Sequence, residues 1–92
     1  MLQTLFLDLR NAMGQRFQVS GMNGCITTGE CANGDLSLRG SGNGWFLATA
    51  RSIARQFNGT WNGVLGSWVI ARQRKHEAIS QLGDICHPVD AL

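Results

Sequence analysis

The chain has 92 residues, of which 43% are hydrophobic and 15% are charged, and its formal net charge at pH 7 is +2. Disordered chains are usually poor in apolar residues and rich in charge, so this composition predicts a folded protein, and the length suits a single domain over residues 1–92. The sequence lacks a run of about 20 apolar residues that could span a bilayer and a basic region before the apolar N-terminal segment, as in a secretory signal. We therefore expect one soluble domain in the cytoplasm.

The first segment of the chain fits two kinds of secondary structure. Residues 2–19 carry apolar side chains at both helical and alternating spacing. We favour a hairpin that turns at residues 11–14 and pairs Leu9 with Phe17, because this pairing buries one face consistently.

Two Asn-Gly pairs divide the next segment. Asn-Gly readily takes the positive backbone angles of tight hairpin turns, and the pairs lie at residues 23–24 and 33–34. Turns at these two pairs predict short strands at residues 25–28 and 35–39.

A helical period begins after Gly44. Five apolar side chains share one face of this predicted helix: Phe46, Ala50, Ile53, Ala54 and Phe57. Asn58-Gly59 supplies a stop signal. Arg51 and Arg55 are four residues apart on the opposite side, so we expect an exposed basic helix face.

Residues 60–82 allow two interpretations. Their apolar residues share one side of a helix, but Arg72 and Lys75 fall in the same stripe, so the helix either breaks there or presents cations to a partner. Alternatively, residues 64–71 form a buried strand. We expect Gly83 to end the last helix and Pro88 to make the tail irregular.

The predicted segments define a fold class. Strands dominate the first half of the chain and helical spacing dominates the second. We therefore expect an α+β fold, in which a small antiparallel sheet from the N-terminal half packs against two or three helices from the C-terminal half.

The cysteines and the acidic residues carry no recognisable metal or catalytic pattern. Cys25, Cys31 and Cys86 include no closely spaced pair, so we expect reduced thiols and no metal. Two alternatives remain open: a zinc site that adds His76 or His87, and a disulfide between Cys25 and Cys31. Because the six acids are scattered singly and no serine lies in a nucleophile elbow, we expect no catalytic residues and no cofactor.

The middle of the chain is strongly basic. No acid lies between Asp35 and Glu77, and the guanidinium group, which dominates this segment, pairs bidentately with phosphate or carboxylate. Three tryptophans, Trp45, Trp61 and Trp68, are interleaved with the arginines, although the last two also match an apolar core stripe. Arg-Trp surfaces are typical of nucleic-acid and protein interfaces. We expect the partner-binding residues to be Arg39, Arg51, Arg55, Trp68, Arg72, Arg74 and Lys75.

A glycine-rich segment joins the strand predicted at residues 35–39 to the helix after it. A loop with three glycines at a helix N-terminus would present free N–H groups to an anion. Residues 39–44 resemble the Arg/Gln-x-x-Gly-x-Gly/Ala motif of acetyl-coenzyme A dependent N-acetyltransferases. The resemblance implies coenzyme A contacts from Arg39, Gly42 and Gly44, although Asn43 replaces an aliphatic residue of that motif and the chain has no tyrosine to act as the acid.

In length, basic centre and lack of catalytic motif, the whole chain is similar to small phage-encoded inhibitors, especially anti-CRISPR proteins. The resemblance implies a non-enzymatic protein that binds stoichiometrically to a multi-subunit host nucleoprotein complex. Its basic surface would contact protein and crRNA, block nucleic-acid target binding, and need no membrane or small-molecule substrate. Two alternatives remain: a host regulatory RNA- or DNA-binding protein, and a minimal acetyl-coenzyme A dependent N-acetyltransferase.

Overall fold

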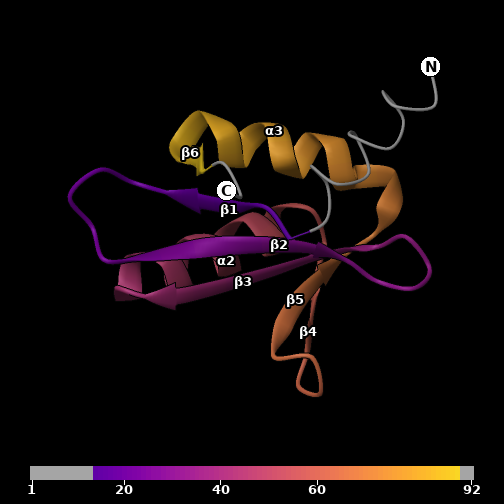
Figure 1. Cartoon of the computed structure of the whole chain (residues 1–92). Helices are drawn as coiled ribbons and strands as arrows, with labels where there is room; N and C mark the ends of the chain where they lie inside the picture. The colour runs from indigo at the N-terminus through magenta and orange to yellow at the C-terminus, as the bar shows by residue number, and fades with distance from the viewer. Residues whose placement is uncertain (1–13, 90–92) are drawn as a thin grey trace.

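The computed structural model describes residues 14–89, which form one antiparallel sheet and two helices (Figure 1). The strands are β1 (Arg16–Gln18), β2 (Gly24–Glu30), β3 (Leu36–Gly42), β4 (Thr60–Asn62), β5 (Ser67–Ile70) and β6 (His87–Val89). They lie in the order β4-β5-β3-β2-β1-β6. The helical segments are α2 (Gly44–Gln56), the 3-10 turn η1 (Arg72–Arg74) and α3 (Lys75–Ile85). The predicted α+β class is confirmed, although β4, β5 and β6 come from the C-terminal half.

The core lies between one face of the sheet and the two helices. Alternate residues along each strand point to opposite faces, and on β1, β2 and β3 the apolar residues that face the helices are buried. The sheet contributes Phe17, Ile26, Leu36, Leu38 and Ile70, and the helices contribute Phe46, Ala50, Ile53, Ala54, Ala78 and Leu82. In Figure 1, α2 lies behind β2 and β3, and neither α2 nor α3 covers the face of these strands toward the viewer. Phe17 lies opposite Ile26 of β2 and Pro88 of β6, and Leu9, its expected partner, lies outside the described residues.

Helix α2 follows the sequence prediction closely. Asn43 caps its start, because the side-chain oxygen accepts a hydrogen bond from the backbone N–H of Trp45 at 2.9 Å. The helix ends at Gln56, and the chain then turns away through Asn58, which has a φ of +58°, and Gly59, whose N–H donates to the carbonyl of Ala54.

Strand β3 extends beyond the end that the sequence predicts at Arg39. It runs to Gly42, and the two glycines are needed where they lie. A Cβ at Gly40 would approach the carbonyl oxygen of Phe46 to 2.5 Å, and one at Gly42 would approach Gly24 Cα to 2.5 Å. The prediction of a three-glycine loop after Arg39 is therefore wrong, because two of these glycines allow close backbone packing within the sheet and under α2.

Residues 60–70 form a hairpin rather than a helix. The prediction of a strand is confirmed for β5, and the helical stripe over residues 60–82 is wrong before Arg72. Asn62 organises the turn, since its side-chain oxygen accepts hydrogen bonds of 3.0 Å from the N–H groups of Val64 and Leu65. The spacing of Trp61, Leu65 and Trp68 fits a helix, but Leu65 lies in the turn of this hairpin and the two tryptophans pair across its strands.

Both predictions for the C-terminal segment are wrong. Helix α3 continues through Gly83 to Ile85, because Leu82 anchors this turn in the core and Gly83 is exposed and unhindered. Pro88 lies in β6, which pairs with β1. Proline is tolerated there because an outer strand does not need every N–H for pairing. No helix within residues 14–89 has the length and apolar character needed to cross a membrane.

Candidate functional site

Two of the basic residues predicted to bind a partner are held by acids of the chain itself. Lys75 Nζ lies 2.7 Å from Glu30 Oε2, and the side chains are only 16% and 21% exposed. Arg74 Nε lies 2.9 Å from Glu77 Oε1, and its guanidinium carbon lies 4.9 Å from the centroid of the Phe57 ring. Glu30 is far from Lys75 in the sequence, but the fold places its carboxylate beside the Lys75 ammonium group.

Arg72 is also engaged within the chain. Its backbone N–H donates to Asp35 Oδ1 at 3.0 Å, and its guanidinium donates to the carbonyl of Asn33 at 2.9 Å. These contacts fasten η1 to the hairpin turn between β2 and β3. The arginine therefore has a structural role in this turn.

The tryptophans lie on the helix side of the sheet. Trp68 is half-buried against the core, and its ring centroid lies 5.3 Å from that of Trp61 in an edge-to-face contact. Trp45 is half-buried at the start of α2, 5.1 Å from Phe46. Trp68 therefore does not share a surface with Arg39, which points to the other side of the sheet.

Apart from Arg72, four exposed arginines make no ion pair within residues 14–89, and they lie on two different surfaces. Arg51 and Arg55 lie on the outer side of α2, as the sequence predicts. Arg39 lies on the sheet face opposite the helices, together with Arg16 from β1. The structure thus divides the predicted basic segment between two opposite sides of the molecule.

We call the sheet face opposite the helices the open face. The side chains of β1, β2 and β3 on this face are Arg16, Gln18, Cys25, Thr27, Ser37, Arg39 and Ser41. Arg16 pairs with Thr27, and Thr27 pairs with Arg39, so the three residues form one row across the strands. Because neighbouring strands lie about 4.8 Å apart, the two arginine Cα atoms are roughly 10 Å apart. Both guanidinium groups can reach one extended anionic ligand.

Hydroxyl, thiol and amide groups surround this row. Cys25 Sγ lies 3.6 Å from Ser41 Oγ and 3.7 Å from Thr27 Oγ1. Gln18 and Ser41 are exposed at the margin of the row. Such groups donate hydrogen bonds to phosphate oxygens, as arginines do.

The acids within residues 14–89 lie away from the open face. Glu30 points to the helix side and pairs with Lys75, and Asp35 lies in the turn before β3. The other two, Glu77 and Asp84, lie on α3. Within residues 14–89, no carboxylate therefore compensates the positive charge of Arg16 and Arg39 on their face, whereas the α2 arginines share the helix side of the molecule with Glu30, Glu77 and Asp84.

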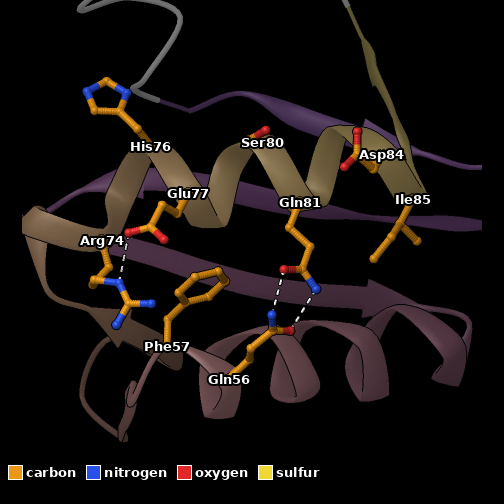
Figure 2. A pocket seen from close by; sticks show the side chains of 9 residues that line it. All are labelled: Gln56, Phe57, Arg74, His76, Glu77, Ser80, Gln81, Asp84 and Ile85. Atoms are coloured by element: carbon orange, nitrogen blue, oxygen red, sulfur yellow. Dashed lines mark hydrogen bonds and ion pairs between the residues drawn. The ribbon is translucent and has the colours of Figure 1, made fainter.

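The groove between α2 and α3 is a second hollow surface, with a volume of about 820 Å³. Figure 2 shows Gln56 of α2 and Gln81 of α3 facing each other across it, and their side-chain amides exchange hydrogen bonds of 2.8 and 2.7 Å. The Arg74–Glu77 ion pair lies at one end of the groove (Figure 2). These contacts engage four of the polar side chains of the groove with one another, and His76, Ser80 and Asp84 line the rest of it.

The start of α2 is also internally satisfied. Asn43 accepts hydrogen bonds from the N–H of Trp45 through its side chain and from the N–H of Phe46 through its carbonyl. Gly42 packs against Gly24. The segment that resembles the acetyltransferase motif thus uses its cap and its glycines to join β2, β3 and α2.

All three cysteines are free thiols, and no group of three or more potential metal ligands occurs within residues 14–89. Cys25 lies in β2 and Cys31 just beyond its end, so six extended residues, or about 20 Å, separate them. This distance excludes the alternative disulfide between them. Burial raises the pKa of the Cys86 thiol above its ordinary value.

No family model, curated protein or solved structure matches this chain. The positions of the side chains are therefore the guide to function. Of the predicted binding residues, only Arg39 lies on the open face, and sequence reasoning missed its partners Arg16 and Thr27. The alternation around Phe17 and Leu38 places both arginines opposite buried residues, but only the strand register shows that they share a row.

Proposed function

We propose that this chain is a non-catalytic, stoichiometric inhibitor that binds a host nucleoprotein complex and blocks its nucleic-acid target site, in the manner of anti-CRISPR proteins. The open face is the surface that contacts RNA phosphates, and Arg16 and Arg39 are its principal charged groups. The row of Arg16, Thr27 and Arg39, on a face where residues 14–89 place no acid, carries this proposal.

Three properties of the open face support phosphate as the ligand. Guanidinium groups bind phosphate oxygens bidentately, and the hydroxyl of Thr27 lies between the two arginines to donate a further hydrogen bond. A sheet face exposes its side chains in a broad array, which suits a backbone that runs across several strands. The face carries no aromatic ring on its central strands, which favours contacts to the sugar-phosphate backbone over base stacking.

An affinity-tag capture from a bacterial lysate, with and without RNase, tests the function. We expect the unmodified chain to recover a defined set of proteins together with one RNA species. Arg16→Glu with Arg39→Glu should lose this complex, and the matched variant Arg51→Glu with Arg55→Glu should retain it. Recovery of heterogeneous nucleic acid alone, lost on RNase treatment, would contradict the inhibitor function and support the alternative of a general regulatory RNA- or DNA-binding protein.

A further inference from the structure

The two outer strands of the described sheet differ in how their edges are protected. At one side, β6 carries Pro88, which has no N–H to offer a further strand. At the other side, β4 consists of Thr60, Trp61 and Asn62, with neither charge nor proline. Natural edge strands usually carry such protection because an unprotected edge pairs with another chain. The β4 edge therefore has the composition of a pairing strand.

Exposed apolar side chains gather at the same edge. Within residues 14–89, three of the five exposed large hydrophobic residues belong to the β4–β5 hairpin: Trp61 at 56%, Val64 at 97% and Leu65 at 49%. Figure 1 shows that this hairpin projects from the rest of the molecule. Scattered apolar residues need no explanation, but a cluster of this kind marks an interaction surface.

We propose that β4 pairs antiparallel with β4 of a second copy, so that two chains form a dimer with one continuous sheet. The pairing is centred on Trp61, which lies beside Trp61 of the other copy, and each Thr60 lies opposite the other Asn62. In a two-fold symmetric contact, the same surface of each copy faces the other, so a charged residue near the axis would meet its own like charge. Such a surface must therefore be free of like-charge repulsion. The uncharged segment from Thr60 to Ala71 meets this condition.

Charge also distinguishes a second copy from a lipid bilayer as the occupant. Hairpins that insert into anionic membranes usually place lysine or arginine beside the apolar tip. The hairpin contains no cation, and the hollow beside Leu65 is lined by Glu30. The edge therefore suits another uncharged strand better than an anionic lipid surface.

The dimer would enlarge the open face. The two-fold axis of an antiparallel strand pair is perpendicular to the sheet, so the open faces of both copies lie on the same side. Arg16 and Arg39 of each copy would then line one extended cationic surface. This consequence rests on the proposed function, whereas the dimer itself does not.

Sedimentation velocity in the absence of nucleic acid tests the dimer. The mass of the unmodified chain should rise across the micromolar range toward twice its 10.0 kDa. Trp61→Lys should remain a monomer, because it places like charges against each other at the two-fold axis. Leu47→Lys, which replaces a similarly exposed apolar residue on α2, should dimerise normally.

Amide hydrogen exchange provides a second test of the dimer. It uses the unmodified chain, so it does not depend on whether Trp61→Lys folds. Protection of the amides in β4 should increase with protein concentration, while protection in β6 stays constant. A mass of one chain at every concentration would overturn the proposal, as would unchanged dimerisation of a folded Trp61→Lys variant. If the chain is a monomer, co-sedimentation with neutral phosphatidylcholine vesicles would identify a lipid surface as the occupant instead.

Discussion

Lys75 Nζ donates a hydrogen bond to Glu30 Oε2 over 2.7 Å, and this contact joins the first residue of α3 to the last residue of β2. Both side chains are mostly shielded from water, so neither charge is well solvated when its partner is removed. The ion pair therefore fixes the position of α3 on the sheet, and it removes Lys75 from the set of cations that can bind a partner.

Replacing Lys75 should reveal this structural role. In Lys75→Met, the shielded carboxylate of Glu30 loses its cation, and the free energy of unfolding should fall by about 1–3 kcal/mol. Urea denaturation followed by circular dichroism measures this loss. Glu77→Gln is the matched control, because it removes the more exposed ion pair with Arg74 and leaves that guanidinium over the Phe57 ring, and such exposed pairs contribute about 0–1 kcal/mol. Equal losses in the two variants would show that the Glu30–Lys75 contact is not a specific tether.

Substitution by alanine should change the stability of the protein in opposite directions at Gly42, which ends β3, and at Gly44, which begins α2. Gly42 has a φ of +84° and its added Cβ would collide with Gly24, so Gly42→Ala should destabilise the protein by more than about 1 kcal/mol. Gly44 lies in the first turn of α2 with open space around it, so Gly44→Ala should be neutral or stabilise by up to about 1 kcal/mol. Thermal unfolding of both variants checks the contrast. A stable Gly42→Ala protein would argue against the close packing of β2 and β3.

The buried thiol of Cys86 should make stability depend on alkaline pH. Its pKa is raised above the ordinary value of 9.0 by burial, so the unfolded chain releases this proton at lower pH than the folded chain does. The contribution of Cys86 is fully present below pH 9.0 and is lost as pH rises from there through the raised pKa. Denaturant unfolding at several alkaline pH values, compared between the unmodified chain and Cys86→Ala, isolates the effect. If the two curves run parallel, Cys86 does not titrate differently on folding.

Local sequence patterns predict part of the fold because some of its elements depend on local interactions. The apolar face of α2 repeats at helical spacing and Asn43 caps its start, so its sequence alone specifies a helix. The hairpin of β4 and β5 is too short to show a strand period, and its two tryptophans match a helical stripe equally well. The continuation of β3 through Gly42 depends on contact with Gly24, which local pattern does not contain.

The candidate site was harder to predict than the fold. Counting charges along the chain identified Arg39 but also Arg72, Arg74 and Lys75, because it could not show which acids or carbonyl groups meet these cations in space. The importance of Arg16 follows only from strand register. Tertiary pairing decides which cations a partner can reach.

The central claim is that the open face, and not the outer side of α2, binds phosphate. Fluorescence anisotropy with a labelled single-stranded RNA, repeated over a series of salt concentrations, counts the phosphate contacts, because each one contributes about 0.7 to the slope of log affinity against log salt. The test compares two double variants. One combines Arg16→Gln and Arg39→Gln, and the other combines Arg51→Gln and Arg55→Gln, which removes the same charge from α2. We predict that the first pair lowers the slope by about two contacts and weakens binding by about tenfold or more, while the second leaves the slope unchanged. The opposite result, a slope that depends on Arg51 and Arg55 alone, would contradict the account and assign phosphate binding to α2.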